Sequence, residues 1–274
     1  MRLPIVRLPF KDGDVYTLYA WGDFHAFSAS CDMGALYDKR EEIASDPMAI
    51  FVFMGDGAEF ITEQDPRWHS GGVDYSLIKP GAAMKIGDVT VDFLAEFFRP
   101  IAGKCIGFHD GNHEKAMNKH NSTSVGERVC RGAGIDLEYH TPGLAMTRII
   151  FTDQHRHACS LVINSAHGHQ AGRMDGAKVN QMKQALAWFH CDLMLRGHSH
   201  SFFASPATWL EPNANHTKLL SKRGYVSHTG SFVKTYGQDQ DSYAEDADYP
   251  PTTIGCPRFL LHPTREGCKI EAVA

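Results

Sequence analysis

The sequence predicts an α/β protein whose sheet begins with parallel strands. Short apolar runs in the first half of the chain alternate with segments whose apolar residues recur at helical spacing. This order of strand, helix, strand, helix and strand is typical of right-handed crossovers and a largely parallel sheet. The chain has 274 residues, 43% of them hydrophobic, and no linker or low-complexity tract divides it. We therefore predict one domain, residues 1–274.

The elements of the first half are bounded by residues that stop helices and strands. In chain order we expect a strand at 15–21, a helix at 33–43, a strand at 48–54, a helix at 89–98 and a strand at 104–108. The pair Asp46-Pro47 ends the first helix, and Pro100 ends the second.

The second half contains more strands than helices. Helices are predicted at 125–131 and 177–189, and strands at 144–152, 158–165, 193–195, 224–228 and around Phe259 and Ile270. Residues 236–253 are polar, contain prolines and predict a long loop.

The composition argues against nucleic-acid and membrane binding and favours metal binding. The net charge of -5 and the pI near 6.3 provide no overall basic field for nucleic acid or a membrane. The first residues have neither the pattern of a signal peptide nor that of a membrane span. Seven scattered cysteines without a CxxC pair indicate a reduced, cytoplasmic setting, and sixteen histidines favour metal binding.

Five polar clusters follow predicted strands, where α/β sheets place their sites. They are GDFH (22–25), GDGAE (55–59), GNHE (111–114), AHGH (166–169) and GHSH (197–200). Any one of them is more typical of a turn or a helix cap. Together they combine Asp, His and Asn without a thiolate, a set that suits Mn, Fe, Zn or Ni. His198 and His200, two apart in an extended segment, are expected to face one cavity, with Ser199 facing away.

This ordered series resembles the calcineurin-like metallophosphoesterase family, whose pattern is DxH, GDxxD, GNH[DE], a His before Gly, and GHxH. The resemblance spans residues 21–201, and the order of all five blocks makes it specific. It implies a four-layer α/β/β/α sandwich, in which two mixed sheets are flanked by helices.

The resemblance also implies two divalent transition-metal ions, with manganese, iron, zinc and nickel as candidates. Asp56 would bridge them, because the two oxygens of a carboxylate can span a pair of ions. The implied ligands of one ion are Asp23, His25, Asp56 and His200, and those of the other are Asp56, Asn112, His167 and His198.

The implied reaction is hydrolysis of a phosphoester by a water molecule that the two ions activate. His113 matches the histidine of the family that assists the leaving oxygen. Glu59 stands where an acidic residue orients that histidine, but a glutamate here departs from GDxxD by one methylene group. Other histidines near the motifs, His109, His169 and His228, are expected to pack around the site rather than bind metal.

The substrate is open at this point. Protein Ser/Thr phosphatases of the family carry an arginine where this chain has Phe60, and they lack GHxH, so we favour a phosphodiesterase of the nuclease-like branch. A nucleotide or nucleic acid would then be the substrate, although GNHE leans toward the protein phosphatases. Weak candidates for contacts with a polyanion are Lys119, His120 and Arg128, and Arg67-Trp68-His69 offers a cation with a stacking surface. The alternatives are a phosphomonoesterase or Ser/Thr protein phosphatase and, in another class, a catalytically silent metal-binding scaffold. No membrane partner is expected, and the sequence leaves the oligomeric state unknown.

Overall fold

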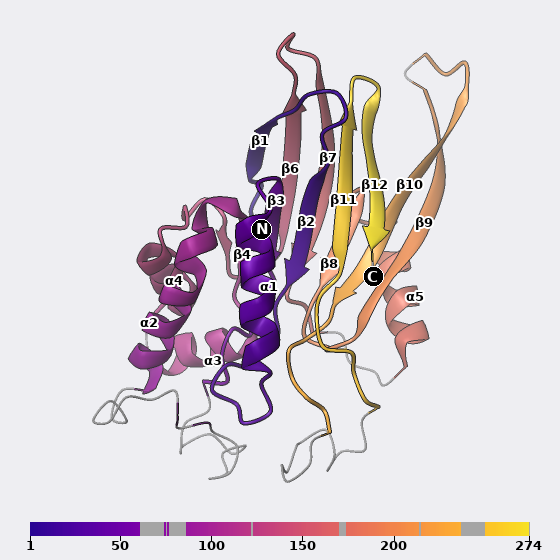
Figure 1. Cartoon of the computed structure of the whole chain (residues 1–274). Helices are drawn as coiled ribbons and strands as arrows, with labels where there is room; N and C mark the ends of the chain where they lie inside the picture. The colour runs from indigo at the N-terminus through magenta and orange to yellow at the C-terminus, as the bar shows by residue number, and fades with distance from the viewer. Residues whose placement is uncertain are drawn as a thin grey trace.

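The chain folds into two mixed sheets that pack face to face, with helices on both outer faces (Figure 1). A computed structural model describes residues 1–60, 74, 76, 86–121, 123–169, 174–213, 215–236 and 250–273. The candidate substrate contact Arg67-Trp68-His69 lies outside these residues, as does most of the loop predicted at 236–253. The four-layer sandwich that the resemblance implies is confirmed.

Within the described ranges, each sheet has six strands and mixes parallel with antiparallel pairs. One sheet has the order β1 (Ile5–Pro9), β6 (Ala145–Thr152), β7 (Ala158–Ala166), β8 (Leu193–Arg196), β10 (Leu219–Thr229) and β9 (Phe202–Pro212). The other has the order β12 (Gly267–Val273), β11 (Arg258–Thr264), β2 (Tyr16–Trp21), β3 (Ala49–Phe53), β4 (Cys105–His109) and β5 (His140–Thr141). Strands β2, β3 and β4 are parallel, as the first half of the sequence predicts, and β5 pairs with β4 in parallel as well.

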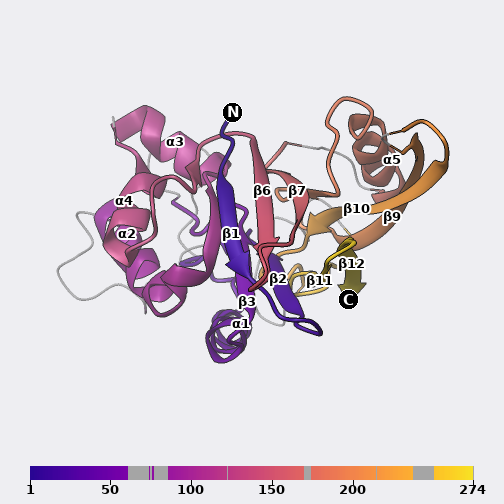
Figure 2. The ribbon, with the colours of Figure 1, turned by 90° about the horizontal axis from the view of Figure 1, so that it is seen from above.

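Helices cover the two outer faces unequally (Figure 2). The sheet that contains β2 is covered by α1 (Met33–Ser45), α2 (Ile86–Phe98), the 3-10 helix η3 (Arg99–Lys104) and α4 (Val125–Ala133). The other sheet is covered by α5 (Asp175–Ala185), while α3 (Asn112–Asn121) follows β4. No helix in the described ranges is long and apolar enough to cross a membrane.

The alternation of side chains along β2 explains why this strand is apolar apart from Thr17. Leu18 and Ala20 pack into the core between the two sheets, whereas Tyr19 and Trp21 pack beneath the helices. Successive side chains of a strand point to opposite faces, so a strand buried on both faces has few polar positions. Such strands are easily found in a sequence, and β2, β3 and β4 were found within two residues of their observed ends.

Among the described residues, five elements were not predicted, namely β1, β5, β9, α3 and the short 3-10 helix η3. Strands β1 and β9 lie at the edges of their sheet and carry prolines, which are tolerated there because an edge strand leaves some N–H groups unpaired. Strand β5 has two residues and exists only through its pairing with β4. Helix α3 is polar and begins inside the GNHE cluster, where no apolar periodicity indicates a helix. The helix predicted at 177–189 instead spans Asp175–Ala185.

A lysine closes the carboxyl end of α1, and its removal should destabilise the fold. The Lys104 ammonium donates to the carbonyl oxygens of Ile43 at 2.6 Å, Ala44 at 3.0 Å and Asp46 at 2.6 Å, which the helix itself leaves unpaired. We expect Lys104→Met to lower the free energy of unfolding by about 2 kcal/mol, because three partly buried carbonyl groups lose a charged partner. Urea denaturation in the presence of a chelator measures this. Lys183→Met, at an exposed position of α5, is the control, and an equal loss in both variants would contradict the capping role.

Candidate metal centre

The predicted ligands lie at the carboxyl ends of five strands, and both sheets contribute. Asp23 and His25 follow β2, Asp56 follows β3, Asn112 follows β4, His167 follows β7, and His198 and His200 follow β8. The ligand atoms of the six Asp and His residues form two neighbouring groups, each with all its atoms within 4.8 Å of one another. The Asn112 side-chain oxygen lies within hydrogen-bond distance of His167 and His198 in one of them. All seven residues that the resemblance implies are therefore brought to one place.

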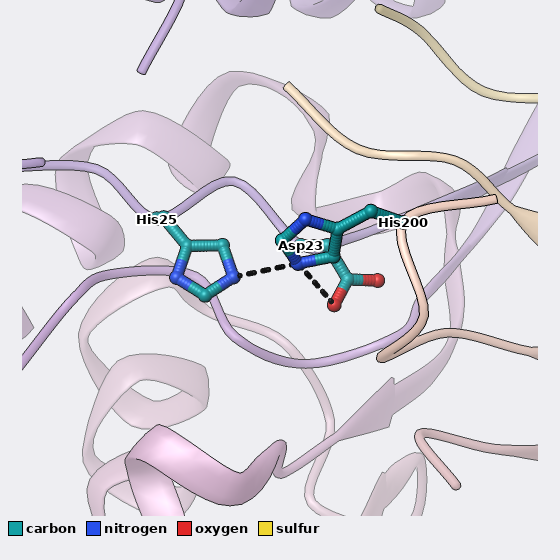
Figure 3. A group of neighbouring side chains, drawn as sticks. All are labelled: Asp23, His25 and His200. Atoms are coloured by element: carbon teal, nitrogen blue, oxygen red, sulfur yellow. Dashed lines mark hydrogen bonds and ion pairs between the residues drawn. The ribbon is translucent and has the colours of Figure 1, made fainter. Parts of the chain in front are cut away.

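The first group consists of Asp23, His25 and His200 (Figure 3). The Nε2 atoms of His25 and His200 lie 3.1 Å apart, and His200 Nε2 lies 3.7 Å from Asp23 Oδ1. The three side chains come from two different sheets, so their convergence depends on how the sheets pack.

The second group consists of Asp56, His167 and His198, with Asn112 between the two histidines. The Asn112 Oδ1 atom lies 2.9 Å from His167 Nε2 and 2.8 Å from His198 Nδ1. His167 Nδ1 donates to the carbonyl oxygen of Met54 at 2.8 Å. Because a carbonyl oxygen can only accept, the proton of neutral His167 is on Nδ1, which leaves Nε2 as a potential ligand atom.

Asp56 lies between the two groups. Its Oδ2 atom is 3.2 Å from His167 Nε2 and 3.9 Å from His25 Nε2. Its Oδ1 atom accepts a hydrogen bond from the backbone N–H of His113 at 3.0 Å, which holds the carboxylate in this orientation. One carboxylate thus faces both ligand groups.

Five of the seven predicted ligands have left-handed backbone conformations. Their φ angles are 50° at Asp23, 49° at His25, 53° at Asp56, 68° at His198 and 56° at His200. Such conformations are uncommon outside glycine and cost on the order of 1–3 kcal/mol each, so they persist where the surroundings enforce them and are concentrated at functional sites. This strain is independent support for a site built from these residues.

The side chains of the site are buried, so burial and the charges of neighbouring residues shift their pKa values. Burial raises the pKa of Asp23 to about 7. Burial opposes ionisation of Asp56 as well, but His167 outweighs it and holds the pKa of Asp56 below its usual value. Burial alone would lower the pKa of His25, yet the Glu59 carboxylate raises that pKa to about 9. Buried carboxylates, imidazoles and an amide oxygen without a thiolate fit divalent transition metals, which replace protons on such ligands.

Glu59 lies beside both His25 and His113. Its Oε2 atom lies 2.7 Å from Nδ1 of His25, whereas its Oε1 atom is 4.0 Å from Nδ1 of His113. His113 Nδ1 instead contacts the backbone carbonyl oxygen of Glu59. The carboxylate of the longer glutamate thus reaches a predicted metal ligand at hydrogen-bond distance and lies at ion-pair distance from His113, while the Glu59 backbone carbonyl oxygen orients the His113 ring.

Glu114 is a site residue whose role the sequence did not reveal. Its buried carboxylate accepts hydrogen bonds from the backbone N–H groups of Asp56 at 3.0 Å, Gly57 at 2.8 Å and Gly111 at 2.8 Å. It therefore ties the GDG loop to the GNHE loop. The sequence shows only an acidic residue directly after GNH. Two of the three backbone N–H groups that this carboxylate binds belong to another loop, and no sequence pattern indicates such contacts.

The secondary histidines and basic residues lie around the site or away from it. His109 is buried, donates from Nδ1 to the carbonyl oxygen of Gly143 at 2.9 Å and packs as expected, whereas His169 is exposed. Ser199 faces away from the ligands, as predicted, toward His228. Arg128 pairs with Asp88 at 2.7 Å, and Lys119 is exposed on α3.

Comparison with known proteins finds solved structures that match most of this chain at low sequence identity and low TM-score. No protein-family model matches this sequence, and no curated protein matches it. The chain is similar to a predicted phosphoesterase from Streptococcus pneumoniae TIGR4, with 11% identity, TM-score 0.33 and coverage of 95% of this chain and 99% of that chain. It is also similar to Vps29 from Entamoeba histolytica in complex with Zn²⁺, with 13% identity, TM-score 0.33 and coverage of 94% and 98%. A metallophosphoesterase from Sphaerobacter thermophilus shows 11% identity, TM-score 0.38 and coverage of 94% and 88%.

These scores are low, so the assignment of the fold rests on the sheets and on the motif order. Two mixed sheets stacked between helices, with five ordered motifs at the ends of their strands, form the four-layer sandwich that the resemblance to the calcineurin-like metallophosphoesterases implies.

Proposed function

We propose that this protein is a metal-dependent hydrolase of phosphoesters, with a phosphodiester as its substrate. The position of Asp56 carries the proposal. Its carboxylate faces His25 on one side and His167 on the other, at 3.9 Å and 3.2 Å, so that two ligand groups share one anionic residue. Such sharing is what a pair of neighbouring cations requires.

The proposed ligands of the two ions follow the two groups. Asp23, His25 and His200 would hold one ion, His167, His198 and Asn112 the other, and Asp56 both. Divalent cations bound there would supply positive charge to phosphoryl oxygens and acidity to a water molecule. The chain itself contributes the orientation of these ligands, through Glu59 on His25 and the Met54 carbonyl on His167.

His113 is the proposed catalytic residue beside the ions. Its side chain is buried, and its ring packs edge-on against His25 with 4.8 Å between ring centroids. Nδ1 contacts the carbonyl oxygen of Glu59 and must carry a proton there. In the imidazolium form both ring nitrogens carry a proton, and we assign Nε2 of that form as the atom that gives a proton to the leaving oxygen or donates a hydrogen bond to the phosphoryl group.

The preference for diesters is supported at Phe60. This residue stands where protein phosphatases of the family carry an arginine, and its side chain is largely buried, so no cation at this position faces a phosphate. Together with GHSH, this favours a phosphodiester, with a nucleotide or a nucleic acid as the proposed substrate class.

The test combines metal content with a comparison of substrates. Purified protein is expected to contain about two transition-metal ions per chain and to hydrolyse an aryl phosphodiester in a chelator-sensitive way. A higher rate on the matching monoester would favour a phosphomonoesterase or protein phosphatase. Metal uptake without turnover of either ester would favour a metal-binding scaffold, and absence of metal uptake would contradict the proposed site.

Replacing His113 separates catalysis from metal binding. We expect His113→Ala to keep its metal content and to lose about 10²–10⁴-fold in kcat, the usual contribution of a general acid. Elemental analysis and steady-state kinetics on the same preparation measure the two effects. His157→Ala, at an exposed turn, should leave both unchanged. Full activity of His113→Ala would exclude the proton-transfer role.

A further inference from the structure

The loop that carries two predicted ligands, residues 198–201, is held from beneath by side chains outside the five motifs. His198 and His200 have φ angles of 68° and 56°, so the backbone on both sides of Ser199 is in an unfavourable conformation. Such a loop keeps its shape only if neighbouring groups fix it. The backbone of Ser201 is fixed in part, because its carbonyl oxygen accepts from the N–H of Gly230 at 2.8 Å.

The first side-chain support is His228, near the end of β10. Its Nδ1 atom lies 2.7 Å from the Ser199 hydroxyl oxygen, and the side chain is fully buried. Its Nε2 atom has no hydrogen-bond partner among the residues that the structure describes. A buried imidazole with one unpaired nitrogen is costly. An apolar side chain at this position could not form the hydrogen bond that His228 makes with Ser199.

The second support is Lys178 on α5. Its ammonium group donates to the Ser201 hydroxyl and lies 3.6 Å from Asp175 Oδ1, whose side chain is 60% exposed. The lysine itself is only 5% exposed, and lysines are almost never buried to this extent. An apolar residue would pack at this position at lower cost, so the structure points to a role for the ammonium group at Ser201.

We propose that His228 and Lys178 are positioning residues of the metal centre, which hold Ser199 and Ser201 so that His198 and His200 face the two ligand groups. This inference rests on the proposed function, since it needs metal at these histidines. It adds α5 and the end of β10 to the parts of the chain on which metal affinity depends, although neither carries a ligand. Groups that orient metal ligands are commonly worth about 10–100-fold in metal affinity.

The test is Co²⁺ binding by the full chain, followed by visible absorption and by titration. We expect His228→Leu and Lys178→Met each to weaken Co²⁺ binding about 10–100-fold and to change the absorption spectrum. His228→Asn can place an amide atom where Nδ1 was, and it should restore most of the affinity. Lys222→Met, on the exposed part of β10 where Lys222 pairs with Glu211 at 3.5 Å, should bind Co²⁺ like the wild type.

Stability of the metal-free protein distinguishes positioning from a general structural role. Lys178→Met removes a buried charge, so its unfolding midpoint without metal should equal or exceed that of the wild type while its Co²⁺ affinity falls. Wild-type affinity and spectrum in both variants would overturn the inference, as would a loss of affinity that only follows a loss of stability. If the wild type takes up no Co²⁺, the proposed function fails, and the inference fails with it.

Discussion

Asp56→Asn is expected to abolish tight binding of both metal ions, whereas Asp23→Asn should weaken mainly one. Asp56 Oδ2 faces His167 and His25, while Asp23 lies only in the group with His25 and His200. An asparagine side chain at position 56 would either point its N–H toward the imidazole of His25 or His167, or leave one of the two ligand groups without an anionic contact. We expect a loss of affinity of about 100-fold or more, beyond the effect of groups that only orient ligands.

Metal content after dialysis, and calorimetric titration with Mn²⁺ or Zn²⁺, measure this loss. Asp153→Asn is the matched control, because that partly buried carboxylate accepts several hydrogen bonds at the β6–β7 turn, at the opposite ends of these strands from His167. It should retain normal metal content. Two ions bound at wild-type affinity in Asp56→Asn would exclude the bridging role and, with it, the arrangement of ions proposed for this site.

Gly111→Ala should remove metal binding although every ligand is still present. A Cβ atom at position 111 would lie 2.0 Å from Asp56 Oδ1 and 2.4 Å from the Asp56 backbone nitrogen. Gly55 approaches from the other side with a φ of 94°, and a Cβ there would lie 2.4 Å from the Gly111 nitrogen. The two loops meet without room for a side chain, so an added methyl group must displace Asp56. We also expect a loss of about 1–3 kcal/mol in the free energy of unfolding.

Metal titration and urea denaturation together test this prediction. Gly103→Ala provides the control, because a Cβ at that position meets no atom within 4 Å. It should fold and bind metal like the wild type. Normal metal uptake in Gly111→Ala would show that the loops can separate without moving Asp56, and the close approach would then have no role in holding the site.

The elements that the sequence predicts well are those buried on two sides. Strands β2, β3 and β4 are continuous apolar runs because each packs against the other sheet and against helices. Strands β1 and β9 lack this pattern, since an edge strand owes its conformation to its neighbour rather than to its own side chains. Helix α3 was missed because its first turn consists of site residues, whose types are set by chemistry and not by packing.

The kinds of ligand and their order along the chain are properties of the sequence by itself. Asp, His and Asn after five strands indicate a divalent-metal site, and glycines beside them indicate sharp turns. The tertiary structure alone decided which side chains meet: Glu59 reaches His25, Glu114 joins two loops through backbone N–H groups, and Lys178 reaches Ser201 from another layer. The reason is physical, because donor chemistry belongs to each residue, whereas a hydrogen bond depends on distances of a few ångströms that are set by the packing of the two sheets.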